Sequence, residues 1–122
     1  THAHGDHAGN LKRYKKARVL IHSGSDVAVE GAEVIDADEY EICPGVRMVH
    51  TPGHCPEECS VFVEADRHYV IAGDTVPLQD NLREGKPPAI NTDHDLAMES
   101  MRRVERFADV VVPGHGAPFL VG

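Results

Sequence analysis

The sequence predicts an α/β fold in which a sheet occupies the middle of the chain. Two observations favour this class. Short apolar runs bounded by glycine, proline or polar turns recur between residues 18 and 74, as expected of strands. A segment with helical character flanks those runs on each side, over residues 8–17 and 92–108. A third observation concerns function: residue types that commonly bind metals follow the ends of several predicted strands.

Composition limits both the size of the fold and its partners. With 122 residues, 41% of them hydrophobic, the chain is expected to form one domain over residues 1–122. Twelve Lys and Arg against 20 Asp and Glu give a formal net charge of −8, which argues against nucleic acid or an anionic membrane as partner. No apolar run approaches the roughly 20 residues of a membrane span, and no signal peptide is visible. We expect a cytoplasmic protein with a small-molecule substrate.

The first half of the chain is expected to begin with a helix and continue as strands. The helix over residues 8–17 is followed by "RVLIH" (18–22), a short buried strand bounded by "SGS". "EVID" (33–36) and "VRMVH" (46–50) are further strand candidates on either side of the turn "CPG".

The second half is expected to hold a hairpin, a long loop, a helix and a last strand. "CSVFVEA" (59–65) and "HYVIAGD" (68–74) form an antiparallel pair, and the proline-containing residues 75–91 a long loop of the kind that borders binding sites. "TDHDLAMESMRRVERFA" (92–108) begins with a Thr-x-x-Asp capping signal and carries apolar residues at helical spacing. The strand "DVVVP" (109–113) then leads into "GHG".

The chain opens with "THAHGDHAGN", which places three histidines and one aspartate in its first seven residues. Only alanine and glycine separate them, so the backbone is free to fold tightly and bring the four side chains together. A solvated terminal tract or the remnant of an affinity tag is the simpler explanation. A tag repeats histidine, however, whereas this stretch alternates as H-x-H-x-D-H.

Three further metal-binding side chains follow strands elsewhere in the chain. His54 lies in a Pro-Gly loop after one predicted strand, Asp74 ends the next apolar strand, and His115 follows the last. A glycine stands beside each of them and permits the close backbone approach that a compact site requires.

Together these residues suit a centre with two metal ions. His2, His4 and His54 are the ligands predicted for one ion, Asp6, His7 and His115 those for the other, and Asp74 is predicted to bridge them. A single histidine of this kind is more often a surface or core residue than a metal ligand. To explain all of these residues in that way, however, five places in the chain would have to match the pattern of a site by coincidence. Two zinc ions, with iron or manganese as alternatives, would stabilise a bridging hydroxide as nucleophile.

The ordered motifs H-x-H-x-D-H, T-P-G-H, A-G-D and P-G-H-G resemble those of the metallo-β-lactamase superfamily, in the branch of glyoxalase II and related thioesterases. The resemblance runs from residue 2 to residue 116. It implies an αββα sandwich with the metal ions at one edge, between its two sheets. It also implies a metal-dependent hydrolase that cleaves a thioester, a lactone or another small ester. Asp6 is then expected to hold the second ion and to orient the nucleophile or take a proton from it.

Two departures from the family pattern affect this prediction. Several strands precede the first motif in the family, whereas this chain begins inside it, so residues 1–122 are expected to be the C-terminal portion of the sandwich. The uncovered sheet face would then pack against an upstream segment or another copy of the chain. Glyoxalase II also has a C-terminal helical region that helps to bind glutathione, but only "APFLVG" follows the last motif here. This argues against a glutathione thioester as substrate.

Three other functions stay open from the sequence. A mononuclear-iron dioxygenase acting on a persulfide resembles the same superfamily and uses only His2, His4 and His54. A metal-binding fragment without activity is the second alternative. The third is a redox protein built on Cys55 and Cys59, which requires an accessible thiol of low pKa.

Overall fold

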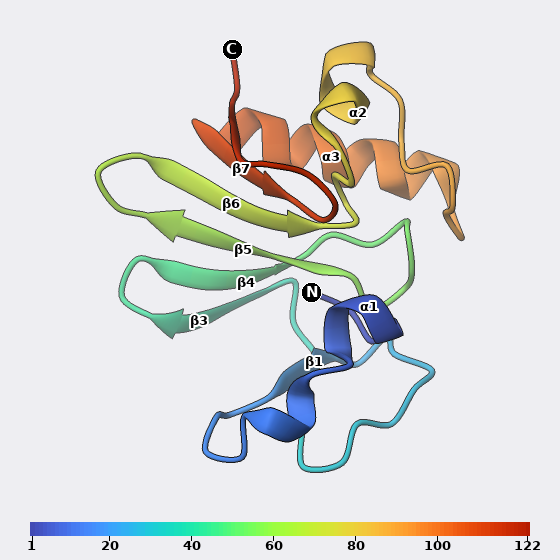
Figure 1. Ribbon diagram of the computed structural model, residues 1–122, viewed down its shortest axis with the longest axis vertical. Coiled ribbons are helices and arrows are strands. Elements are labelled where there is room, and N and C mark those ends of the chain that lie inside the picture. The colour runs from blue at the N-terminus through green and yellow to red at the C-terminus, as the bar shows by residue number, and fades with distance from the viewer.

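The computed structural model describes residues 1–122 and is built around a six-stranded sheet in the order β3-β4-β5-β6-β7-β8 (Figure 1). All neighbouring strands are antiparallel except β6 and β7, which are parallel. The strands are β3 (Glu39–Cys43), β4 (Val46–His50), β5 (Cys59–Glu64), β6 (His68–Gly73), β7 (Val110–Pro113) and β8 (Phe119–Leu120). A second, two-stranded parallel sheet pairs β1 (Leu20–His22) with β2 (Glu33–Ile35).

The parallel pairing of β6 with β7 requires a crossover, which α2 (Gln79–Glu84) and α3 (His94–Phe107) provide. The Asp93 side chain caps α3 by accepting a hydrogen bond of 2.9 Å from the Leu96 N–H. The predicted helix is confirmed, but its cap is Asp93 and not Thr92. The Thr92 hydroxyl instead donates to the Gly53 carbonyl, which fastens the start of α3 to the loop after β4.

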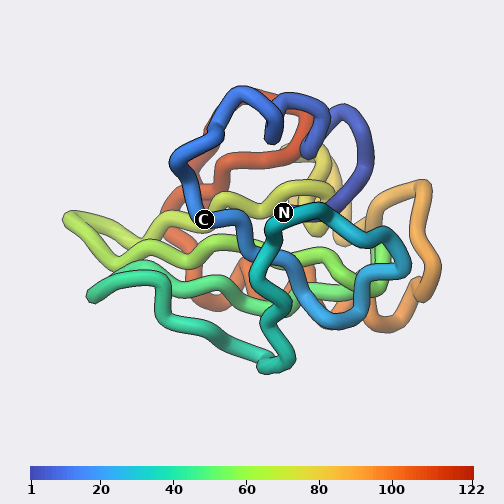
Figure 2. The backbone as a smooth tube through the Cα atoms, turned by 90° about the horizontal axis from the view of Figure 1, so that it is seen from below, coloured from blue at the N-terminus to red at the C-terminus, as the bar shows by residue number.

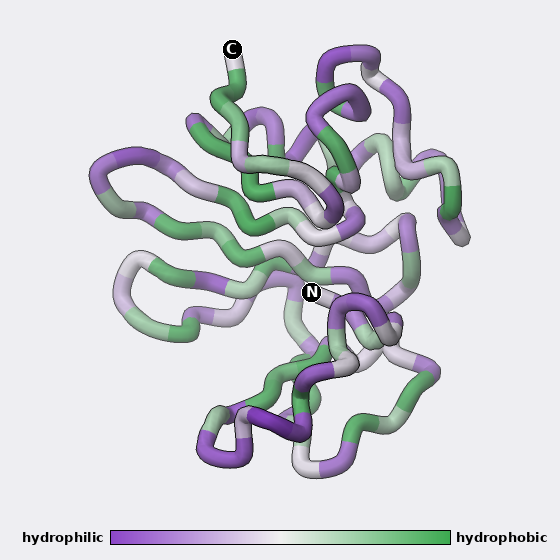
Figure 3. Tube along the Cα trace, viewed as in Figure 1, coloured by the Kyte–Doolittle hydropathy of each residue, from purple (hydrophilic) through white to green (hydrophobic).

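The main core lies between α3 and one face of the large sheet. It contains nine buried residues from the strands, the crossover and α3: Val49, Phe62, Val70, Ala72, Val76, Met101, Val104, Ala108 and Val111. Apolar stretches follow the central strands in Figure 3. Side chains alternate across a strand, so Met48 faces away from its neighbour Val49. Met48 packs with Ile35 and Cys59 in a smaller cluster against the two-stranded sheet.

The face of the large sheet opposite α3 is only partly covered. The N-terminal segment and the two-stranded sheet lie on that side (Figures 1 and 2), and a mainly apolar cavity lined by Leu11, Leu20, Met48 and Val61 separates them from the strands. Farther along the same face, Ile71 is 43% exposed. The fold is therefore of the predicted α/β class. Within residues 1–122, the layer on the face opposite α3 covers only part of the large sheet.

Three elements differ from the sequence predictions. Residues 8–17 do not form one helix, because α1 (Gly5–Ala8) ends at Gly9 and is followed by a 3₁₀ turn at Leu11–Arg13. The segment after Gly9 is largely polar and exposed, so it has no apolar face to bury. Strand β3 was not predicted; it is short, carries two glutamates and is mostly exposed, so it has no apolar run of the kind that marked the other strands. The predicted loop 75–91 contains the short helix α2.

None of the helices combines the length and the apolar character that crossing a membrane would require.

The rings of His22 and His50 stack between the two sheets, with centroids 3.5 Å apart and an interplanar angle of 9°. His22 Nδ1 accepts the Gly24 N–H at 3.1 Å, and His50 Nε2 donates to the Pro56 carbonyl at 2.7 Å. Burial and the neighbouring His50 ring lower the pKa of His22, although hydrogen bonding to the Ala37 backbone opposes them. His22 is therefore held neutral in the fold.

This histidine makes stability depend on pH in a defined direction. As the pH falls below the ordinary histidine pKa of about 6.5, the unfolded chain binds a proton at residue 22 more readily than the folded chain does. The free energy of unfolding should fall through that range and level off below the folded pKa. Urea titrations with chelator at several pH values should show a smaller decline in a His22→Gln variant. Equal declines would assign the pH dependence to other groups.

Candidate metal centre

The first residues of the chain are fixed to the start of β5 by backbone contacts. The Cys59 N–H donates to the Thr1 carbonyl at 3.0 Å, and the Ala3 N–H donates to Glu57 Oε1 at 3.4 Å. The chain then turns into α1, whose backbone hydrogen bonds start from the His4 carbonyl. This turn directs the side chains of the H-x-H-x-D-H motif toward one point above the sheet.

His54, Asp74 and His115 lie close to this motif because the strands before them run in the same direction. Strand β5 is antiparallel to both β4 and β6, so β4 and β6 run the same way, and β7 is parallel to β6. These three strands therefore end at the same edge of the sheet, and the loops that follow them carry His54, Asp74 and His115. In Figure 1, α1 lies beside these strand ends.

The first predicted group of ligands is compact, and its members are buried except His4, which is exposed. His4 Nδ1 lies 3.0 Å from His2 Nε2 and 3.2 Å from His54 Nε2. Asp74 Oδ2 lies 3.4 Å from His54 Nε2 and 3.8 Å from His2 Nε2. Ligand atoms of a tetrahedral zinc site with bonds of about 2.1 Å are about 3.4 Å apart. The spacing of these four atoms therefore fits one such ion.

The second predicted group has the same spacing around the other oxygen of Asp74. Asp74 Oδ1 lies 3.3 Å from His7 Nε2 and 3.1 Å from His115 Nε2. Asp6 Oδ2 lies 3.4 Å from His7 Nε2 and 3.6 Å from His115 Nε2. His7 Nε2 and Asp74 Oδ1 are buried yet form no hydrogen bond. Unpaired buried polar atoms are costly, and a cation between them would satisfy both.

All seven predicted side chains thus converge, in the two groups expected, although they come from four separate segments of the chain. The groups differ in exposure. The His2 and His54 side chains are 0% and 6% exposed, whereas those of Asp6 and His115 are 59% and 47% exposed. The candidate centre therefore reaches solvent at Asp6 and His115 of the second group and at His4 of the first.

The histidines of the first group are oriented by hydrogen bonds on their far nitrogens. His54 Nδ1 lies 2.7 Å from the Ile90 carbonyl, and His2 Nδ1 lies 2.8 Å from Glu58 Oε2 and 3.1 Å from Thr1 Oγ1. A proton on each Nδ1 leaves Nε2 as the nitrogen with a lone pair, directed at the other ligands. The structure thus prepares both rings for metal binding.

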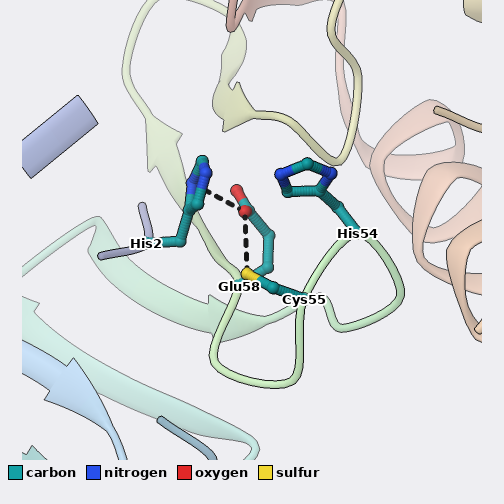
Figure 4. A group of neighbouring side chains, drawn as sticks. All are labelled: His2, His54, Cys55 and Glu58. Atoms are coloured by element: carbon teal, nitrogen blue, oxygen red, sulfur yellow. Dashed lines mark hydrogen bonds and ion pairs between the residues drawn. The ribbon is translucent and has the colours of Figure 1, made fainter. Parts of the chain in front are cut away.

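Glu58 was not predicted from the sequence. It forms a buried group with His2, His54 and Cys55, shown in Figure 4. These four residues also have the spacing of a metal site, but Glu58 contacts His2 through Nδ1, while His2 Nε2 lies near His4 and Asp74. We therefore interpret Glu58 as a support for the first group of ligands and not as a competing site. Nothing in the local sequence "CPEEC" distinguishes it from Glu57.

Two glycines of the motifs leave space for carboxylates. A side chain at Gly114 would place its Cβ 2.2 Å from Asp74 Oδ1. Gly73 has a left-handed φ of +54°, and a Cβ there would lie 2.5 Å from Glu58 Oε1. Glycine is therefore required sterically in both P-G-H-G and A-G-D.

The electrostatic environment distinguishes Asp6 from the cysteines. Burial opposes ionisation of Asp6, but its backbone hydrogen bond and the charges of His7, His115 and His2 bring its pKa below the usual value.

Burial together with nearby glutamates raises the pKa of Cys55, and burial raises that of Cys59 to about 12. Both thiols are buried. The redox alternative required an accessible thiol of low pKa, which neither residue provides.

Comparison with known proteins agrees with this arrangement. A family model described as the metallo-beta-lactamase superfamily matches residues 21–115. The probable metallo-hydrolase MJ0296 of Methanocaldococcus jannaschii is 31% identical over 118 residues, covering 94% of this chain and 54% of that protein. An N-acyl homoserine lactonase of a Bacillus species is 26% identical over 121 residues, covering 86% of this chain and 48% of the lactonase. The chain thus spans about half the length of these curated relatives.

A solved structure shows the same fold. The crystal structure of TTHA1623 in a di-iron-bound form matches with a TM-score of 0.69 and 22% identity, covering 100% of this chain and 70% of that one. The fold and the converging side chains define an α/β protein with a histidine- and carboxylate-rich candidate metal centre at the sheet edge. The chain belongs to the metallo-β-lactamase superfamily.

The shared contacts of Asp74 generate a prediction. An Asp74→Ala variant should lose affinity for both ions, because its two oxygens face the two groups separately. Asp66→Ala should keep wild-type affinity, since the Asp66 side chain accepts only the Tyr69 hydroxyl at an exposed turn. Metal analysis after dialysis against a weak chelator measures the difference. Equal retention in the two variants would show that Asp74 is not a shared ligand.

Proposed function

We propose that the protein is a hydrolase that uses two metal ions to cleave a small ester, thioester or lactone. The observation that carries this proposal is the position of Asp74, whose Oδ2 lies 3.4 Å from His54 Nε2 and whose Oδ1 lies 3.3 Å from His7 Nε2, while His115 Nε2 is 3.1 Å from Oδ1 and 3.4 Å from Oδ2. A relative named as a metallo-hydrolase and one named as an N-acyl homoserine lactonase support the reaction class. Zinc is the proposed metal, because imidazole nitrogens and carboxylates at this spacing suit it. Iron is the first alternative, since the structural neighbour TTHA1623 was solved in a di-iron-bound form.

His2, His4, His54 and Asp74 would hold the first ion, and Asp6, His7, His115 and Asp74 the second. When bound, such ions polarise a carbonyl oxygen and lower the pKa of water, which makes it a nucleophile near neutral pH. Asp6 is ionised and more than half exposed, so its carboxylate is placed to orient the attacking water or accept its proton.

A small-molecule substrate fits the shape and charge of this site. His2 and His54 are buried, whereas His4, Asp6 and His115 are exposed, so the reacting bond would approach from the side of these three residues. Loops at that edge would then select the substrate.

The persulfide dioxygenase alternative needs only His2, His4 and His54. The convergence of Asp6, His7 and His115 on Asp74 Oδ1 favours two ions over one. A one-ion enzyme would leave His7 Nε2 and Asp74 Oδ1 buried without a hydrogen bond, at a cost in stability.

The proposal is tested by metal analysis and turnover of the same preparation. We expect about two ions per chain, hydrolysis of a nitrophenyl ester, an acyl thioester or an N-acyl homoserine lactone, and loss of that activity on chelation with recovery on adding zinc. A His115→Ala variant should bind one ion and lose most of the activity, whereas His94→Ala, exposed at the start of α3, should change neither.

Two results would contradict the proposal. One iron per chain, with oxygen consumed in the presence of a persulfide, would assign the dioxygenase function. Full occupancy by two ions without turnover of any of the three substrates would identify a metal-binding fragment without this activity.

A further inference from the structure

Glu58 is a buried acid that pairs with no lysine or arginine. Its side chain is 0% exposed, and the only ion-pair partner that it has is His2. Burying a carboxylate costs several kcal/mol unless charges and hydrogen bonds compensate. A hydrophobic residue at this position, between a loop and a strand, would avoid that cost. The presence of an acid here therefore calls for a function that the metal ligands alone do not explain.

The two oxygens of Glu58 contact two different ligand-bearing segments. Oε2 lies 2.8 Å from His2 Nδ1 and accepts the Cys55 thiol at 3.7 Å, and Oε1 accepts the backbone N–H of Asp74 at 3.1 Å. Figure 4 shows the carboxylate directed between the His2 ring and the Cys55 sulfur, on the same side as the ring of His54. One carboxylate thus connects the N-terminal motif to the loop after β6.

We propose that Glu58 is a positioning residue that sets the affinity of the first metal site. By accepting a hydrogen bond from His2 Nδ1–H, it keeps the proton on Nδ1 and leaves Nε2 unprotonated and oriented toward His4 and Asp74. By accepting the Asp74 N–H, it fixes the backbone of the residue whose side chain faces both groups. The inference rests on the metal centre of the proposed function, but not on the reaction that the centre performs.

Charge gives a second reason for an acid at this position. Two divalent ions would bring four positive charges into the centre, of which Asp6 and Asp74 balance two. Glu58 supplies a third negative charge from the protein interior, behind the first ion. Bound ions would in turn stabilise the buried carboxylate, since opposite charges attract strongly away from water. Metal binding and the burial of Glu58 should therefore support each other.

The surroundings of Glu58 are shaped to admit it. Gly73 adopts a left-handed conformation, and a Cβ at that position would lie 2.5 Å from both Glu58 Oε1 and Thr1 Cβ. The glycine before Asp74 therefore allows the carboxylate to reach the Asp74 N–H. The neighbouring Glu57 makes a weaker contact, 3.4 Å from the Ala3 N–H, and forms no hydrogen bond or ion pair with a predicted ligand side chain. This gives a matched control one residue away.

The test compares zinc affinity in Glu58→Gln and Glu57→Gln, each of which removes one negative charge with little change in volume. Glutamine at residue 58 keeps one oxygen, which cannot replace both contacts of the carboxylate. Competition with a chromophoric chelator should show a first-site affinity about 10- to 100-fold weaker in Glu58→Gln, the usual effect of losing such a partner. Glu57→Gln should remain within about threefold of wild type on the same assay. Circular dichroism of the metal-free proteins checks that both variants are folded.

A measurement on the unaltered protein keeps the proposal falsifiable if Glu58→Gln does not fold. Nitrogen-15 spectra of the imidazoles in metal-free protein at pH 7.5 should show the proton of His2 on Nδ1. A proton on Nε2 would overturn the proposal, as would wild-type affinity in Glu58→Gln or an equal loss in Glu57→Gln. If wild-type protein itself binds no zinc, iron or manganese, the proposed function fails first. Zinc binding without hydrolysis would leave the role of Glu58 intact.

Discussion

The carboxylate of Asp74 is the constraint on which the site depends. Its two oxygens are directed at two groups of nitrogens, so three other loops must arrive within hydrogen-bonding distance of one side chain. The strand directions of the large sheet make this arrangement possible, because β4, β6 and β7 run the same way and all end at one edge. Gly114 then leaves the space that Asp74 Oδ1 occupies. Sheet topology and a glycine turn thus bring the other three loops to the two oxygens of this one side chain.

Much of this was predictable because it depends on local patterns. Strands β4, β5 and β6 and helix α3 were recognised from their apolar periodicity, and all seven candidate ligands from residue type, spacing and position after strands. Their convergence is now observed, while their role as ligands stays a prediction. The parts that were missed depend on tertiary contacts. Strand β3 exists because it pairs with β4, and its own sequence is too acidic to suggest a strand.

Glu58 shows the same limit at the site. In the sequence it is one of two adjacent glutamates in a turn, and nothing local distinguishes it from Glu57. The difference appears only when the N-terminal motif folds onto β5, which places His2 against Glu58 and leaves Glu57 near the Ala3 backbone. The helix predicted over residues 8–17 was wrong for a related reason. Propensity favoured it, but the fold offers that segment no surface on which to bury an apolar face.

The incomplete second layer of the sandwich affects the two halves of the centre differently. The core between the sheet and α3 supports the strands that carry His54, Asp74 and His115, and this core is closed and well packed. The N-terminal motif lies on the other side, where a cavity separates it from the sheet. Thr1 and Ala3 are attached through the Thr1 carbonyl on Cys59 and the Ala3 N–H near Glu57, and His2 through its ion pair with Glu58. His4 and His7 contact the core side only through the side chains of the other candidate ligands, His54 and Asp74 among them. Metal ions shared through Asp74 would join the weakly held motif to the rigid core, so metal binding in this chain should stabilise the fold as well as supply the chemistry.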